Sequence, residues 1–113
     1  MSETTIFSKI INGEIPCDKL HEDELCIAFN DISAQAPVHF LVIPKKPIIS
    51  LYECDEEDKD LLGHLLLVGK NIAKSKNLKT WRTVINTGKE SGQTVFHLHI
   101  HFLTGRKMRW PPG

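Results

Sequence analysis

Apolar residues in this chain recur with a helical period in two segments and alternate with polar residues in others. Thr5 to Gly13 spaces its apolar residues three and four apart between a threonine and a glycine, which predicts a short capped helix. A longer helical stripe runs from about Asp55 to Lys76, with acids at its start and lysines at its end, as the helix dipole favours. Alternation predicts a hairpin over Lys19 to Asn30 and a strand over Val38 to Ile43, which prolines flank.

Two more strands complete the expected fold. Trp81 to Asn86 predicts a fourth strand, Gly88 to Thr94 a loop, and Val95 to Leu103 a fifth strand. Five mostly sequential strands with two helices indicate an antiparallel α+β domain, because a doubly wound parallel sheet needs a helix between most strands. The 113 residues show no repeat or linker and fit one domain over residues 1–113, of which we expect 1–4 to be flexible.

Composition narrows the classes of partner. Fourteen lysines and arginines balance 14 acids, so no net charge attracts a nucleic-acid polymer or an anionic membrane, and we expect neither as a partner. No signal peptide and no apolar run of about 20 residues is visible, which favours the cytoplasm, together with the nucleus in a eukaryote. Cys17, Cys26 and Cys54 are odd in number and lack metal-site spacing, which is typical of a reduced protein.

The densest candidate chemistry lies in the fifth predicted strand. There, His97, His99 and His101 occupy alternate positions and would share one face. The opposite, apolar face would consist of Phe96, Leu98, Ile100 and Phe102. Residues two apart on a strand are about 7 Å apart at the backbone, so neighbouring imidazoles repel each other's charge, and one ring can stay neutral while another is protonated. That division suits a two-step transfer of phosphorus through a covalent histidine intermediate.

The loop before this strand supports an anion site, because its glycines expose backbone N–H groups beside the histidines. By itself such a loop is more often a simple turn. Two other interpretations of the histidines stay open. They are a solvated polar strand face, although Thr, Lys, Glu or Ser usually fill one, or a zinc site completed from elsewhere in the chain. No Cys, Asp or Glu in the segment completes a ligand set, so we expect no metal and no cofactor.

A family resemblance joins these features. The segment His97 to Leu103 resembles the His-φ-His-φ-His-φ-φ motif of the histidine triad (HIT) superfamily, where φ is apolar. Phe29 to Lys46, the loop Gly92 to Thr94 and the tail Trp110 to Gly113 resemble the Hint branch, and the likeness spans Thr5 to Gly113. The tail distinguishes this branch from the fragile-histidine-triad branch. The resemblance implies a HIT-like fold that dimerises through the long helix and an edge strand.

The activity that the resemblance implies is that of a purine nucleoside phosphoramidase. Such an enzyme hydrolyses P–N bonds of adenosine 5′-phosphoramidates, and aminoacyl-adenylates, to AMP through a nucleotidyl-histidine intermediate. The implied partners are a small purine nucleotide such as AMP and a second copy of the chain. Two alternatives remain, a non-catalytic nucleotide-binding or scaffold protein and a dinucleoside polyphosphate hydrolase, and the tail disfavours the latter.

The resemblance also implies catalytic roles. His99 would be the nucleophile, and His101 would stabilise the phosphate and assist the leaving group. His97 and His39 would orient the nucleophile through a hydrogen-bonded chain, and Thr94, where Ser is usual, retains a hydroxyl group.

On the same likeness, Asp31 would bind the ribose. The apolar base pocket would consist of Ile6, Phe7, Ile10, Phe29 and Ile32. The phosphate side would consist of Asn86, Gly92, Gln93 and Thr94, with His99 and His101. Asn30 departs from a position often held by His in animal members, so contacts there should differ. We expect no catalytic part for His21 and His64.

Two features concern packing and the partner chain. Gly63 and Gly69 each weaken the long helix, which predicts close packing against another backbone. Trp110 lies in a tail that we expect to be exposed and to reach towards the partner's active site.

Overall fold

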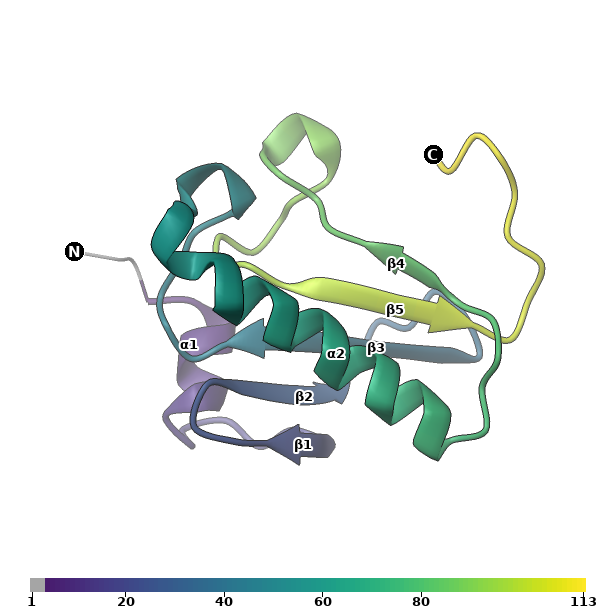
Figure 1. Cartoon of the computed structure of the whole chain (residues 1–113), viewed down its shortest axis with the longest axis horizontal. Coiled ribbons are helices and arrows are strands. Elements are labelled where there is room, and N and C mark those ends of the chain that lie inside the picture. The colour runs from purple at the N-terminus through teal and green to yellow at the C-terminus, as the bar shows by residue number, and fades with distance from the viewer. Residues whose placement is uncertain (1–3) are drawn as a thin grey trace.

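Five strands form a single antiparallel sheet in the order β1-β2-β3-β5-β4 (Figure 1). This is a computed structural model that describes residues 4–113, so the expectation for the N-terminus falls on residues 1–3 outside the described part. The strands are β1 (Lys19–Glu22), β2 (Cys26–Asn30), β3 (Val38–Pro44), β4 (Arg82–Val84) and β5 (Ile100–Thr104). The two helices are α1 (Ile6–Ile11) and α2 (Lys59–Ser75). The predicted α+β architecture is confirmed.

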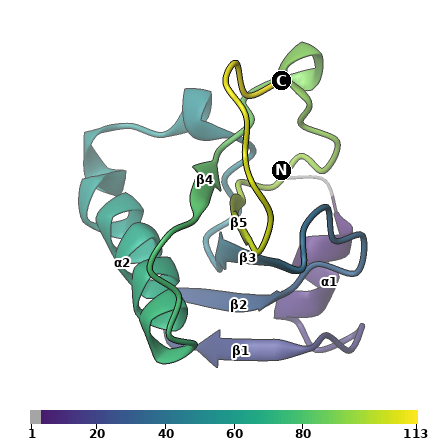
Figure 2. The same cartoon turned by 90° about the vertical axis from the view of Figure 1, so that its right-hand side faces the viewer.

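The two helices lie on opposite faces of the sheet, as Figure 2 shows. Alternation along the strands therefore builds two cores. The core on the α2 face includes Phe40, Val42, Ile100, Phe102 and Leu65, and the core on the α1 face includes Phe7, Ile10, Phe29, Leu41 and Ile43. On β3 and β5, histidines occupy positions of the α1 face that would otherwise hold apolar residues. Their side chains consequently point away from α2.

Local signals explain where the helices begin. Thr5 caps α1 in a capping box, in which the backbone N–H of Ser8 donates to Thr5 Oγ1 over 3.1 Å and the N–H of Thr5 donates to Ser8 Oγ over 2.8 Å. The long helix starts later than its polar pattern predicts, because residues 56–58 form a 3₁₀ turn that Asp55 caps. In residues 4–113, no helix is long and apolar enough to cross a membrane.

The close packing predicted for the two helical glycines is found at Gly69. A Cβ added there would lie 2.0 Å from the Phe102 ring of β5, so only glycine lets α2 approach the sheet this closely. The contact is with a side chain, not with a backbone. At Gly63 an added Cβ would meet nothing within 4 Å in the described chain, so close packing within one chain does not explain that residue.

The prediction for the histidine segment is wrong in part. We expected a strand over Val95 to Leu103, but β5 begins only at Ile100, and the residues before it bend. The cause lies in β3, whose last residue, Pro44, pairs with β2 and has no N–H for a ladder. Its carbonyl oxygen instead accepts a hydrogen bond from the His97 side chain. Phe96, expected in the core, is 44% exposed.

The fourth strand is also shorter than predicted. Only Arg82, Thr83 and Val84 of β4 pair with β5, although the pattern extended from Trp81 to Asn86. The 3₁₀ turn Lys89–Ser91 follows inside the predicted loop. This loop and the bent segment after it leave the sheet and reach the α1 face, where the candidate site lies.

Candidate active site

A cavity of about 290 Å³ lies beside α1, near the lower end of the usual size of small-molecule sites. Apolar residues dominate its walls, and carboxylate, hydroxyl and imidazole groups interrupt them. Of the residues predicted to bind substrate, those that line the cavity are Ile6, Phe7, Ile10, Phe29, Asp31, Ile32, Thr94, His99 and His101. The structure therefore brings most of the predicted pocket together from separate parts of the chain.

Hydrogen bonding fixes the tautomer of His99. Its Nδ1–H donates to the backbone carbonyl oxygen of His97 over 2.8 Å. A carbonyl oxygen only accepts, so Nδ1 carries the proton and, in a neutral ring, the lone pair lies on Nε2. The ring of Phe7 packs edge-on against it, with centroids 5.0 Å apart, which restricts rotation of the imidazole. His99 is thus a buried imidazole that has one unprotonated nitrogen and lines the cavity.

His39 and His101 have the opposite arrangement. The backbone N–H of Gln35 donates to His39 Nδ1 over 3.0 Å, so the proton of a neutral His39 lies on Nε2. This Nε2–H donates to Nδ1 of His101 over 2.9 Å, which leaves the His101 proton on its Nε2. Because the His99 and His101 ring centroids are 4.9 Å apart, one cavity wall presents a nitrogen lone pair next to an N–H donor.

The four histidines of the ligand-free site carry little positive charge. Burial lowers the pKa of His39, His97 and His99 below the ordinary histidine value. For His101, repulsion from His99 and His39 adds to burial, and the pKa falls to about 4, although Asp31 opposes the shift. The rings are therefore neutral near pH 7. The expectation that one of them is protonated does not hold for the free site.

The carboxylate of Asp31 is held at the cavity by its own loop. The backbone N–H of Ser33 donates to Asp31 Oδ1 over 2.8 Å, and Oδ2 lies 3.4 Å from His39 Nε2. The side chain is partly buried, at 17% exposure, and it lines the cavity. Asp31 thus keeps acceptor capacity for a ligand that offers hydroxyl groups.

His97 lies behind the cavity wall. Its Nε2–H donates to the backbone oxygen of Pro44 over 2.8 Å, and its own backbone oxygen accepts the bond from His99. His39 in turn contacts His101 and not His99. The expected chain of orienting contacts therefore reaches His99 through a backbone carbonyl, and the side-chain link from His39 ends on the neighbouring ring.

The side chain of Gln93, predicted to bind substrate, is committed to the loop. Its Oε1 accepts from the backbone N–H of Gly88 over 2.9 Å, and its Nε2 donates to the backbone oxygens of Ile49 and Val95 over 2.7 and 3.1 Å. Since the residue is only 1% exposed, Gln93 shapes the segment that precedes the histidines.

The other residues predicted for the phosphate side of the pocket fall into two groups, those that line the cavity and those that do not. Thr94 lines the cavity, whereas Asn86, Gly92 and Gln93 are not among the lining residues of the described chain. Gly92 has a left-handed φ of +98°, which favours glycine and lets the loop turn back beside Asn86. We therefore attribute the position of Thr94 to Asn86, Gly92 and Gln93.

Part of the cavity wall was not predicted from the sequence. The lining also includes residues 15–18, Ser33, Leu41 and Val95, together with Asn30, where altered contacts were expected. Residues 15–18 reach the site because the Asn30 side chain donates to Asp18 Oδ2 over 2.7 Å and the Asn30 N–H donates to the Asp18 backbone oxygen over 3.0 Å. No local pattern signals such a contact. For Leu41, alternation with His39 on the same strand could have indicated the shared face.

Two groups of metal-ligating atoms occur within residues 4–113. Asp31, His39 and His101 form one of them inside the cavity, but the facing nitrogens of the two imidazoles are bonded to each other. The other group lies on the opposite face of the sheet. Neither corresponds to a zinc site on neighbouring triad histidines.

Comparisons with known proteins agree with this geometry. Residues 4–110 match the family described as "Scavenger mRNA decapping enzyme C-term binding". An uncharacterized HIT-like protein of Synechococcus elongatus is 60% identical over 114 residues, with 100% of both chains covered, and one of Synechocystis is 56% identical with the same coverage.

Solved structures give the same result. A HIT family hydrolase from Legionella pneumophila is 42% identical with a TM-score of 0.95, covering 97% of this chain and 100% of the other. A histidine triad protein from Clostridium difficile is 42% identical with a TM-score of 0.90, covering 96% and 97%. The triad, its cavity and these relatives show that the chain belongs to the histidine triad superfamily.

Proposed function

We propose that this protein is a purine nucleoside phosphoramidase, which hydrolyses the P–N bond of adenosine 5′-phosphoramidates and also cleaves aminoacyl-adenylates. The observation that carries the proposal is the pairing of tautomers. The lone pair of His99 Nε2 and the proton of His101 Nε2 belong to adjacent rings of one cavity wall. A nucleophile next to a proton donor is what displacement of an amine from phosphorus requires.

In the first step, His99 Nε2 attacks phosphorus and the P–N bond to the leaving amine breaks. His101, protonated in the complex because the bound phosphate is anionic, gives its Nε2 proton to that amine, so the amine departs neutral and the His101 ring becomes neutral. The nucleotidylated His99 ring is now cationic, and its Nδ1–H remains bonded to the His97 carbonyl oxygen, whose dipole stabilises the positive charge. In the second step, water attacks phosphorus, its proton passes to His101 Nε2, and the bond from phosphorus to His99 breaks to release AMP.

Substrate binding would change the charge of the wall. A bound phosphate is anionic, and an anion beside an imidazole favours its charged form. The depressed pKa of His101 should therefore rise in the complex, which makes a proton available where the leaving group departs. The hydrogen bond between His39 Nε2 and His101 Nδ1 holds that ring in the orientation the transfer needs.

The rest of the cavity supports a nucleoside. Asp31 can accept hydrogen bonds from both hydroxyls of a ribose, and the hydroxyl of Thr94 can reach a phosphate oxygen or the leaving group. The apolar wall of Phe7, Ile10 and Phe29 suits a purine ring. This combination favours a purine ribonucleotide over a phosphorylated sugar or peptide.

The test is turnover of a fluorogenic adenosine tryptamine phosphoramidate by wild type, His99→Ala and His99→Asn. Both substitutions should reduce kcat by about 10⁴-fold or more, because no remaining group can form the covalent intermediate. The matched control is Tyr52→Ala, which removes an 85% exposed ring outside the cavity and should retain wild-type turnover. Unchanged turnover in His99→Ala would exclude His99 as the nucleophile.

Two alternatives give distinct results in the same assay. A non-catalytic nucleotide-binding protein would bind AMP without any turnover by wild type. A dinucleoside polyphosphate hydrolase would prefer such a compound, assayed in parallel, over the phosphoramidate.

We also propose that the protein is a homodimer that associates through α2 and an edge strand. Leu66 and Leu67 of α2 are 44% and 56% exposed, next to the open position of Gly63. Burying such a stripe against a second copy removes apolar surface from water. Trp110, 84% exposed in the C-terminal tail, would then reach the partner's cavity and influence which leaving groups fit. Sedimentation that finds a stable monomer at micromolar concentration would contradict this proposal.

A further inference from the structure

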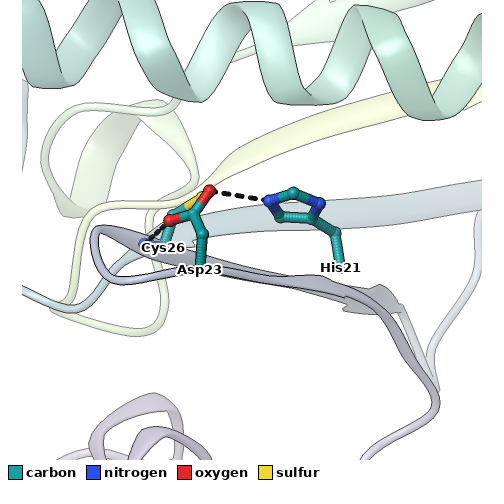
Figure 3. A group of neighbouring side chains, drawn as sticks. All are labelled: His21, Asp23 and Cys26. Carbon is teal, nitrogen blue, oxygen red and sulfur yellow. Dashed lines mark hydrogen bonds and ion pairs between the residues drawn. The ribbon is translucent and has the colours of Figure 1, made fainter.

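A second polar cluster lies on the α2 face of the sheet, away from the cavity. It consists of His21 on β1, Asp23 in the turn between β1 and β2, Cys26 on β2 and His64 on α2, and we call it the hairpin cluster. His21 and Asp23 project from the hairpin towards α2 (Figure 3). None of the four residues lines the candidate active site.

Three side chains converge on one oxygen atom of the fourth. Asp23 Oδ2 lies 2.7 Å from His21 Nε2, 2.8 Å from His64 Nε2 and 3.6 Å from Cys26 Sγ. The ligating atoms of His21, Asp23 and Cys26 all lie within 4.8 Å of one another, a space that one ion could fill. His64 Nε2 reaches the same Asp23 oxygen from outside that group.

The turn fixes the carboxylate from its other side. Asp23 Oδ1 accepts the backbone N–H groups of Leu25 and Cys26 over 2.8 and 2.9 Å, while the Asp23 N–H donates to the Cys26 backbone oxygen over 3.0 Å. Oδ2 is consequently the oxygen left to face the other ligating side chains. A carboxylate oriented by backbone donors is the kind of preorganised ligand that supports a metal site.

Access from solvent is open, although the sulfur is buried. The side chains of His21, Asp23 and His64 are 36%, 29% and 34% exposed, whereas Cys26 is fully buried beneath them. A shallow pocket lined by Asp23, Glu24, Leu25 and His64 opens at this point. The pocket thus gives solvent access to the Asp23 carboxylate and the His64 imidazole, behind which the thiol lies.

The carboxylate of Asp23 is the acidic group of the hairpin cluster, and the lysine nearby has another partner. The nearby ammonium group of Lys45 is engaged in an ion pair with Glu22 at 2.8 Å.

We propose that the hairpin cluster is a transition-metal site that binds Zn²⁺ through His21 Nε2, His64 Nε2, Cys26 Sγ and Asp23 Oδ2. Thiolate and imidazole ligands select zinc and similar ions over Mg²⁺ and Ca²⁺, which prefer oxygen. Binding replaces the thiol S–H bond by a sulfur–metal bond, and the released proton passes to solvent.

Only small movements are needed to admit the ion. Tetrahedral zinc at about 2.1 Å from each ligand separates neighbouring ligand atoms by about 3.4 Å. The distances from Asp23 Oδ2 to the two imidazole nitrogens must therefore open by about 0.6 Å, and the distance to sulfur is already close to that value. The side chains of His21 and His64 are partly exposed, so these two rings can supply the shifts, and His64 Nε2 must also approach the other ligand atoms.

A bound ion would join the β1–β2 hairpin to α2. In the free protein, the hydrogen bond between Asp23 and His64 links these elements across 41 positions of sequence. An ion at that point would add a crosslink that the unfolded chain does not form, and it would raise the stability of the folded state with metal concentration.

The test uses chelator-treated protein titrated with CoCl₂, followed by competition with ZnCl₂. Wild type should give the visible bands of tetrahedral Co²⁺ together with thiolate-to-cobalt charge transfer, and ZnCl₂ should abolish both. Cys26→Ser should lose the thiolate band. His64→Gln changes only a partly exposed side chain and should weaken affinity by at least about 10- to 100-fold.

Two controls separate this site from other ligands in the chain. Cys54→Ser removes a thiol outside the cluster and should leave the cobalt spectrum unchanged. His101→Gln alters the cavity on the other face and should also leave it unchanged. In a thermal scan, ZnCl₂ should raise the Tm of wild type and of Cys54→Ser, but not that of His64→Gln.

Three results would overturn the proposal. They are Co²⁺ bound without thiolate absorption, metal binding lost in His101→Gln but retained in His64→Gln, and no binding of either ion at large excess. If Cys26→Ser fails to fold, His64→Gln and the thermal scan still decide the question.

Discussion

The two faces of the sheet carry the same types of residue in opposite arrangements. On the α1 face, the imidazole nitrogens are bonded to backbone groups and to each other, and the Asp31 carboxylate lies 3.4 Å from the nearest ring. On the α2 face, two imidazoles contact a single oxygen of Asp23 at 2.7 and 2.8 Å. Backbone partners fix the tautomers of His39 and His99, and His39 fixes that of His101, which leaves a lone pair and a proton for a substrate. A shared carboxylate instead gathers the ligating atoms of several side chains around one point.

Of the substitutions that distinguish the two faces, His101→Ala on the α1 face should have the largest effect. If His101 protonates the leaving amine, kcat for an aliphatic phosphoramidate of adenosine should fall by about 10²- to 10⁴-fold. The loss should be much smaller for a p-nitrophenyl ester of AMP, whose leaving group departs without a proton. Steady-state assays of both substrates check this, with Tyr52→Ala as the control. Equal losses for the two substrates would assign His101 a role in binding only.

The packing of the α2 face is tested by a matched pair of glycine substitutions. Gly69→Ala should lower the free energy of unfolding by about 1–3 kcal/mol, because its Cβ would overlap the Phe102 ring. Gly63→Ala adds the same methyl group in open space and should raise stability by up to about 1 kcal/mol through helix propensity. Urea denaturation measures both. Equal effects of the two substitutions would contradict the close approach of α2 to β5.

A smaller effect concerns the free energy of unfolding at acid pH, which His101 on the α1 face should reduce. The pKa of His101 is about 4 in the folded chain and 6.5 in its unperturbed state, so between these values the unfolded chain binds more protons. The free energy of unfolding should therefore fall as pH falls through this window. Partial exposure reduces the contribution to on the order of 2 kcal/mol. Urea denaturation near pH 7 and near pH 4 should show a smaller pH difference in His101→Gln than in wild type.

Alternation along the chain predicted most of the scaffold of the α1 face. His39 and His101 each share a strand with apolar residues that face α2, so the period of two correctly divided the face with Phe40 and Phe102 from the face with the imidazoles. The extent of β5 could not be predicted in the same way. It depends on Pro44 of another strand, which ends the ladder, and on Ile48, whose oxygen accepts the N–H of Leu98 over 2.7 Å.

The sequence did not reveal the hairpin cluster at all. His21, Asp23 and Cys26 are close in sequence, but His64 lies 41 positions from Asp23, and a helix and a hairpin must dock before the four meet. Gln93 shows a related limit. The family resemblance implied ligand contact for its side chain, whereas its amide bonds to Gly88 and Ile49 arise only once the loop has folded. Local pattern predicts which face a residue occupies, but not which distant backbone group it meets.

The strict alternation of β5 also limits how the chain can vary in length. His101 faces the cavity and Phe102 fills the recess above Gly69, so inserting or deleting one residue in this strand would turn the imidazole towards the apolar core under α2 and the benzyl ring towards the cavity. Insertions should therefore not be tolerated between Ile100 and Thr104.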